Sequence, residues 1–134
     1  MKKILLDTNA YSHLLRGDQT VFHTLSQSET IYFSIFVMAE LLTGFKQGNK
    51  EISNKDLLFR FISKPTVRVL DATIETAQIF SQIKTALSEA GTPIPIHDIW
   101  IASHAMEIGA VLVTYDDHFK KIYGLRLWDN IGQP

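Results

Sequence analysis

The sequence predicts an α/β fold: a three-layer α/β/α sandwich around a mainly parallel sheet. Short apolar runs alternate with helix-like segments along the chain, which is the order of strands and helices in such a fold. Two of these runs end abruptly on polar residues, Asp7 after the first run and Thr114 after a later one. Strands of a parallel sheet are buried on both faces, so the first polar residue after each strand emerges at the carboxyl edge, where ligands bind.

Five segments are predicted as strands, because strand-forming residues are enriched in them and polar or turn residues bound them. They are residues 3–6, 30–34, 66–70, 110–113 and, as a short last strand, 125–128.

The helical segments carry apolar residues three or four positions apart, as in the stripe of Val37, Leu41 and Phe45. A helical hairpin is expected from about residue 37 to 62, with Ser53–Asp56 at the spacing of a capping box for its second helix. Asp71 or Thr73 is expected to cap a long helix that reaches Ala90. The other helices are expected over 10–16, where Thr8 or Asn9 would be the cap, over 20–27 and 97–109, and as one turn around 119–122.

Length and composition indicate one domain, residues 1–134, which is long enough to bury its own core. The 13 basic and 14 acidic residues give a net charge of −1, which argues against a generally basic surface for nucleic acid. With no cysteine, the chain has no disulfides, thiolate metal ligands or thiol nucleophile. The first apolar run is too short for a signal peptide, and no run approaches a membrane span, so we expect a cytoplasmic protein without a membrane segment.

Four acids occupy similar places in the predicted elements. Asp7 and Asp116 come just after buried strands, while Glu40 and Asp98 lie near the starts of apolar helices. Taken singly, each fits a plainer role as a turn, first-turn or surface acid, although Glu40 interrupts an otherwise apolar segment. Together they predict one crevice. Crowded carboxylates repel one another unless a cation is present, and Mg²⁺ or Mn²⁺ prefers such oxygen ligands.

Four motifs carry these acids in order: residues 5–9 (LLDTN), residues 34–44 around Glu40, residues 98–105, and residues 112–116 followed by Phe119. In this order and spacing they resemble a PIN-domain nuclease, and more narrowly the VapC toxins of the VapBC toxin–antitoxin systems. The resemblance covers nearly the whole chain. It implies a PIN-like α/β/α domain that acts as a Mg²⁺- or Mn²⁺-dependent endoribonuclease.

The resemblance also implies roles for individual residues. The catalytic positions are Asp7, Glu40, Asp98 and Asp116, of which Asp7, Asp98 and Asp116 bind metal directly; Glu40 binds it through water or orients the nucleophile. The supporting positions are Thr8, Asn9 and Thr114, and Asp117 is a candidate to share the role of Asp116. His118 stands where related sequences often carry an acid or another polar residue. The implied reaction is metal-assisted phosphodiester hydrolysis that leaves a 5′ phosphate and a 3′ hydroxyl.

The implied partners are an RNA substrate, a VapB-like antitoxin and a second copy of the chain in a homodimer. Contact with DNA is implied only indirectly, through the antitoxin. The RNA target stays open among transfer RNA, ribosomal RNA and message, because all present the same phosphate to the site. The hairpin residues are candidates either for an antitoxin groove or for core packed against the sheet. They are Leu41, Leu42, Phe45, Leu58 and Phe61.

Several other residues have simpler interpretations. His97, next to Asp98, is either a partner of that acid or a ligand, or it serves at the surface or as a cap, which is the favoured assignment. His104 is assigned to packing or solvent. Trp100 either stacks a base or belongs to the core or a subunit contact, and the latter is favoured. Arg16 and several lysines are candidates to steer RNA or are ordinary surface charge; the lysines are Lys46, Lys50, Lys120 and Lys121. Two other functions remain open: a phosphatase with Asp7 as nucleophile, and a non-enzymatic domain whose acids only cap helices.

Overall fold

A four-stranded parallel sheet forms the centre of the computed structural model, which describes residues 2–133. Its strands are β1 (Lys3–Leu6), β2 (Thr30–Ser34), β3 (Val67–Leu70) and β4 (Val111–Val113), arranged in the order β3-β2-β1-β4. Each neighbouring pair is parallel, and β1 has a partner on both sides. The predicted fold class is therefore confirmed.

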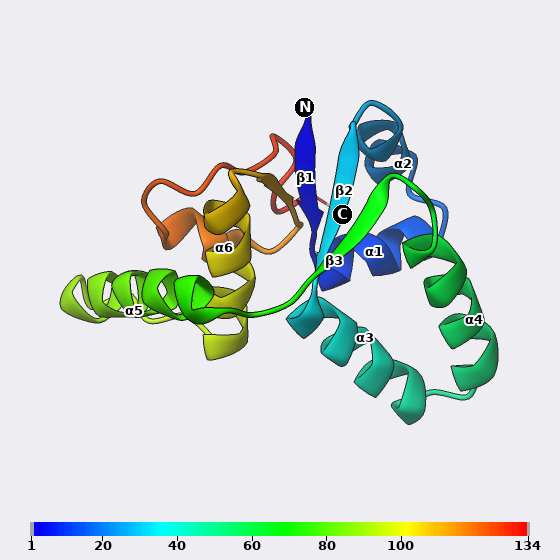
Figure 1. The fold of residues 1–134 in the computed structure, drawn as a ribbon, viewed down its shortest axis with the longest axis horizontal. Helices are drawn as coiled ribbons and strands as arrows, with labels where there is room; N and C mark the ends of the chain where they lie inside the picture. Colours follow the sequence, from blue (N-terminus) through cyan, green and yellow to red (C-terminus); the bar gives the residue numbers. More distant parts are fainter. Residues whose placement is uncertain (1, 134) are drawn as a thin grey trace.

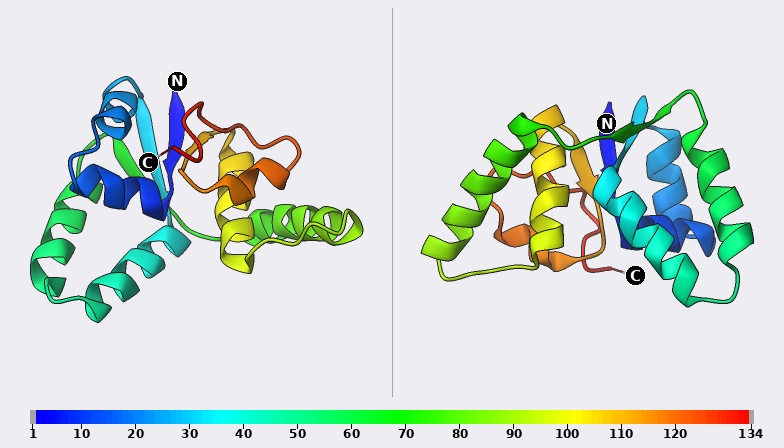
Figure 2. Two further views of the ribbon diagram at one scale, coloured as in Figure 1. Left: turned by 180° about the vertical axis from the view of Figure 1, so that it is seen from behind. Right: turned by 60° about the horizontal axis from the view of Figure 1, so that its bottom comes forward.

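Helices cover both faces of the sheet (Figures 1 and 2). One layer contains α1 (Thr8–Leu15), α2 (Gln19–Ser26), α3 (Ile35–Gln47) and α4 (Glu51–Ile62), and the other contains α5 (Ile74–Glu89) and α6 (Ile96–Ile108). The chain moves outward from β1 to β3 and then returns to place β4 on the other side of β1. The gap between the carboxyl ends of β1 and β4 is thus the switch point of the sheet, where ligands bind in folds of this class.

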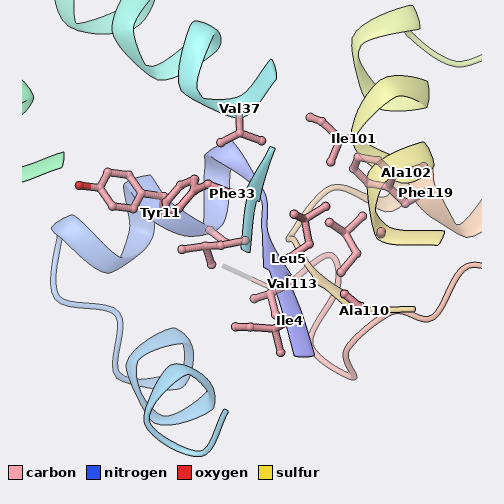
Figure 3. Close-up of a cluster of buried hydrophobic side chains, with 14 of the residues drawn as sticks. Ile4, Leu5, Tyr11, Phe33, Val37, Ile101, Ala102, Ala110, Val113 and Phe119 are labelled. Carbon is pink, nitrogen blue, oxygen red and sulfur yellow. The ribbon is translucent and has the colours of Figure 1, made fainter. Parts of the chain in front are cut away.

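The core lies on both sides of the central strand. Ile4, Leu5 and Leu6 of β1 are completely buried, as expected for a strand covered by two helical layers. Tyr11 and Phe33 lie on one side of this strand and Ile101 on the other (Figure 3). Three rings pack edge to face with centroids 5.5–5.6 Å apart; they belong to Tyr11, Phe33 and Phe61.

The helix boundaries confirm some of the predicted caps and correct others. Thr73 caps α5 in a reciprocal capping box with Thr76. However, α1 begins at Thr8, and Asp7 caps it in place of Thr8 or Asn9, because the Asp7 carboxylate accepts from the Thr8 N–H. The predicted capping box at Ser53–Asp56 is wrong. The helix α4 begins earlier, at Glu51. The negative charge of Glu51 in the first turn interacts favourably with the helix dipole, and its carboxylate pairs with Lys46 at 3.1 Å.

The predicted last strand over 125–128 is also wrong, since this segment pairs with β4 at only one bridge, Leu112 to Leu127. The backbone of Leu112 bonds to Arg126 and Trp128 on either side of the bridge. Beyond it the Trp128 side chain turns into the interior and its indole N–H donates to the Thr114 carbonyl. The segment therefore runs parallel to β4 at this one bridge and does not form a fifth strand.

The apolar residues of the helical hairpin pack in or against the core, with Leu42 and Phe61 partly buried. Leu41, Phe45 and Leu58 are buried, and Phe61 packs against Tyr11 and Phe33. The apolar side chains that α4 exposes are others, such as Leu57 and Phe59. Within the described part of the chain, no helix is long and apolar enough to cross a membrane.

Candidate active site

A cleft of about 340 Å³ opens at the switch point between β1 and β4. All four predicted catalytic acids line it, although they come from four separate segments: Asp7 follows β1, Glu40 lies on α3, Asp98 begins α6, and Asp116 follows β4. The other lining residues are Thr8, Asn9, Ser12, His13 and Arg16, all from α1 or its carboxyl end.

Asp7 is the most deeply placed of the acids, with 5% of its surface exposed. Its Oδ1 accepts from the Thr8 N–H at 2.8 Å, and its Oδ2 accepts from the Thr114 hydroxyl at 2.7 Å. Burial raises the pKa of Asp7 to about 7, against the two hydrogen bonds and with a smaller contribution from the nearby charges of Asp98 and Glu40. The apolar strand thus carries a carboxyl group into a place where its charge is poorly solvated.

Thr114 joins the ends of the two strands that border the cleft. Besides donating to Asp7, its hydroxyl accepts from the Asp116 N–H at 3.0 Å. The Asn9 side-chain oxygen accepts from the Tyr115 N–H, also at 3.0 Å. These bonds fix the turn after β4 against the start of α1, so Asp116 is held at a defined position relative to Asp7. Thr114 and Asn9 therefore lie between Asp7 and the turn that carries Asp116, and their supporting role stays a prediction.

At the other side of the cleft, His118 lies between two of the acids. Its Nδ1 is 3.1 Å from both the Asp98 Oδ2 and the Asp116 Oδ1. These three side chains can offer ligand atoms that all lie within 4.8 Å of one another. Burial raises the pKa of Asp98, the hydrogen bond from His118 opposes this, and the charge of Asp116 adds to it.

Sequence reasoning gave His118 no role of its own and considered Asp117 for a share in the Asp116 position. The structure separates these two neighbours. The chain forms a 3₁₀ turn over Asp117–Lys121, in which the Asp116 carboxylate caps the turn by accepting from the His118 N–H at 2.9 Å. As a result His118 faces the acids, whereas Asp117 is exposed and does not line the cleft. An imidazole directly after two consecutive acids was the only sequence signal for this arrangement.

Glu40 approaches the cleft from α3 and remains partly exposed. The Thr8 hydroxyl donates to its Oε1, and the His97 Nε2 lies 3.2 Å from the same oxygen. The first turn of α6 points His97 at Glu40, which favours the alternative of a partner to the acids over a surface or cap position. This contact explains the acid within the apolar segment of α3: it faces the cleft and its polar neighbours rather than the core.

The donor set of the cleft fits a divalent cation. Carboxylate oxygens predominate, with one imidazole at the Asp98–Asp116 corner, and hard cations such as Mg²⁺ and Mn²⁺ bind such groups. The upward shifts in the pKa of Asp7 and Asp98 show that crowding and burial disfavour their charged forms in the protein alone. A bound cation would reverse this penalty.

The fold and this cleft define a doubly wound α/β domain with an acidic site at its switch point, and the PIN domain family model matches residues 4–125. The chain is 30% identical to ribonuclease VapC2 of Rickettsia felis, over 93% of this chain and 97% of the relative. It is 32% identical to the tRNA(fMet)-specific endonuclease VapC of Salmonella typhimurium, over 96% of this chain and 98% of the relative. The chain therefore belongs to the PIN-domain family, and within it to the VapC proteins.

Solved structures agree with this placement. The crystal structure of VapBC2 from Rickettsia felis bound to a promoter DNA fragment matches with a TM-score of 0.84 and 29% identity, covering 95% of this chain and 99% of that one. DNA-bound VapBC from Salmonella typhimurium matches with a TM-score of 0.84 and 28% identity, covering 96% and 98%. The similarity extends through the whole domain, including all four segments that carry the acids.

Proposed function

We propose that this protein is a Mg²⁺- or Mn²⁺-dependent endoribonuclease, the toxin of a type II toxin–antitoxin pair that acts in the cytoplasm. The observation that carries the proposal is the convergence of Asp7, Glu40, Asp98 and Asp116 on one cleft. The ribonuclease names of its relatives support the substrate class. One of them is named a tRNA(fMet)-specific endonuclease, which makes transfer RNA the first substrate to test.

The proposed metal-binding residues are Asp7, Asp98 and Asp116. When bound, a divalent cation supplies positive charge next to the scissile phosphate and lowers the pKa of an attacking water. Both oxygens of Asp7 are already fixed by hydrogen bonds, so its carboxylate needs little rearrangement to act as a ligand. Asp116 is fixed in the same way by the backbone N–H of His118.

Glu40 has the role of orienting the attacking water. It is the most exposed of the four acids, and its Oε1 accepts from the Thr8 hydroxyl and lies 3.2 Å from the His97 Nε2. The second oxygen of this carboxylate is the acceptor available for a proton from water. Glu40→Gln keeps the shape of the side chain and removes its basicity, so this substitution separates a role in proton transfer from a role in packing.

The geometry disfavours a phosphatase with Asp7 as nucleophile. An enzyme of that kind needs a general acid or base beside the attacking carboxylate to serve the leaving group. The residue two positions after Asp7 is Asn9, whose amide cannot transfer a proton and whose oxygen accepts from the Tyr115 N–H. No observation favours the non-enzymatic alternative over catalysis.

The direct test uses purified protein free of antitoxin, incubated with transfer RNA and Mg²⁺ or Mn²⁺. Cleavage that EDTA stops and that Asp7→Asn abolishes supports the proposal. Glu29→Gln, which removes an exposed acid away from the cleft, is the matched control and should cleave like the wild type. Intact RNA in the presence of folded, metal-loaded protein would refute the proposed activity. If the purified protein cleaves RNA, sequencing of RNA ends after its brief expression in cells would identify the natural target.

The proposed partners are a VapB-like antitoxin and a second copy of this chain. The matched solved structures are titled as VapBC complexes, which supports an antitoxin partner. For the homodimer, the first turns of α3 and α6 offer exposed apolar side chains, Ile35 and Ile96. Beside them, Trp100 stacks between Phe36 and Phe80 while remaining partly exposed. Light scattering on the wild type and on Ile96→Glu tests this face, since the variant should be monomeric.

A further inference from the structure

The cleft continues beyond the four acids along one face of α1. Thr8, Ser12 and Arg16 are four residues apart and all line it, with Asn9 and His13 beside them. The opposite face of the same helix carries the buried Ala10 and Tyr11. At a rise of about 1.5 Å per residue, Ser12 lies about 6 Å and Arg16 about 12 Å along the helix from Thr8. The cleft therefore has an acidic end and a basic end.

Arg16 differs from two other basic residues of the chain in its surroundings. Arg60 pairs with Asp56 at 2.6 Å, and Lys46 pairs with Glu51 at 3.1 Å. Among residues 2–133, by contrast, no carboxylate lies within 4.0 Å of the Arg16 guanidinium. An arginine that lines a cleft without a protein partner is available to an anionic ligand, and its planar fork suits the oxygens of a phosphate.

The wall that carries Arg16 is fixed relative to the acids. The Tyr115 hydroxyl donates to the Asp18 Oδ2 at 2.7 Å, and the same oxygen lies 3.4 Å from the His13 Nδ1. The rings of His13 and Tyr115 pack with centroids 4.5 Å apart. At the other end of α1, the Tyr115 N–H donates to Asn9. The residue just before Asp116 thus holds both ends of α1, so the distance from Arg16 to the acids is set by the fold.

We propose that Arg16 binds the RNA phosphate two linkages away from the scissile one, with the Ser12 hydroxyl beside the intervening phosphate. Successive phosphates of an extended single strand are separated by a distance similar to the pitch of an α-helix, about 5.4 Å. Two turns of α1 therefore match two linkages of RNA. This inference rests on the proposed function, because it takes the acidic end as the place of the scissile phosphate. It makes Arg16 a substrate-positioning residue and requires a single-stranded backbone in the cleft.

The first test measures cleavage kinetics and RNA binding for Arg16→Gln and Arg16→Lys. Arg68→Gln, which removes an exposed arginine from β3 outside the cleft, is the matched control. We expect Arg16→Gln to raise KM about 10-fold with little change in kcat, and Arg16→Lys to recover part of the loss. For binding, a single-stranded RNA of about 12 nucleotides is titrated into the Asp7→Asn protein with and without Arg16→Gln. Loss of one phosphate contact should reduce the slope of log affinity against log salt by about 0.7.

The second test locates the contact. In this RNA, each phosphate in turn is replaced by an uncharged methylphosphonate, and the effect of Arg16→Gln is measured on every substrate. The effect should disappear only when the neutral linkage lies two positions from the cut. A loss of folding would not depend on the position of the linkage. If the wild type cleaves the RNA but Arg16→Gln has the same effect on every substrate, or no effect on any, this inference is overturned while the proposed function stands. Absence of cleavage by the wild type would instead overturn the proposed function.

Discussion

Replacement of Asp7 by asparagine should stabilise the metal-free protein while abolishing its activity. The carboxyl group is almost completely buried, and its pKa is raised from 3.8 to about 7 by that burial. Asparagine has the same shape. Its amide oxygen can accept from the Thr8 N–H, and its amide N–H₂ can donate to the Thr114 hydroxyl. Both contacts are therefore kept, although donor and acceptor exchange roles at Thr114. What it removes is a negative charge in a poorly solvated place.

The magnitude follows from the two pKa values. A group whose pKa is higher in the folded than in the unfolded protein contributes stability below the unfolded value, and this contribution is lost as the pH rises through the folded value. For Asp7 the loss therefore extends from about pH 4 to just above pH 7. At about 1.4 kcal/mol for each pH unit, the difference corresponds to about 4 kcal/mol at pH 8, which water entering the cleft would reduce.

The assay is urea unfolding in EDTA at pH 5 and at pH 8, for the wild type, Asp7→Asn and the surface control Glu29→Gln. Groups away from the cleft titrate alike in the wild type and in Asp7→Asn, so the difference between the two proteins reports Asp7 and its smaller coupling to Asp98 and Glu40. We expect the variant to be more stable at pH 8 by about 2–4 kcal/mol, and by much less at pH 5. Mg²⁺ should then stabilise the wild type and not the variant. A variant that is no more stable than the wild type at pH 8 would refute the reasoning.

Substitutions at three further positions test other parts of the site and its support. Thr114→Val removes the hydroxyl that donates to Asp7 and should lower the free energy of unfolding by about 1–3 kcal/mol, while Thr114→Ser should largely preserve it; thermal unfolding measures both. His118→Asp makes the Asp98–Asp116 corner an all-oxygen site, so cleavage assays at varied metal concentration should show activation moving from Mn²⁺ towards Mg²⁺. His104→Leu removes the partner of the buried Ser34 hydroxyl, which lies 2.8 Å from its Nδ1, and should destabilise the protein by about 1–3 kcal/mol in urea unfolding, whereas an unchanged midpoint would contradict that contact.

The sheet and the placement of the acids could be predicted from the sequence for one physical reason. Strands buried on both faces are short apolar runs, and the residue at which such a run stops must lie at the carboxyl edge of the sheet. Asp7 and the residues after Val113 satisfied this condition directly. Glu40 was recognisable because it interrupts an apolar helix, and the structure shows that the interruption faces the cleft.

The contributions of His118 and His97 could not be predicted in the same way, because each depends on a local turn. A 3₁₀ turn after β4 directs His118 back towards Asp98. If this turn began two residues later, the His118 side chain would point in another direction. His97 meets Glu40 only because α3 and α6 approach each other across the sheet edge, which no spacing within either segment encodes. The prediction of a last strand failed for a related reason, since its sequence favours extended structure but the chain pairs with β4 at a single parallel bridge.

The polar face of α1 is an intermediate case. The spacing of Thr8, Ser12 and Arg16 is visible in the sequence, but a polar helix face usually means only contact with water. Its meaning comes from the fold, which places the start of this helix beside Asp7. The same short turn after β1 thus buries one carboxylate and aims a row of polar groups along the cleft. The acids repel an RNA phosphate until a cation neutralises their charge, whereas Arg16 attracts a phosphate without a cation. The basic end of the cleft can therefore hold the RNA strand before the acidic end has bound the metal needed to cut it.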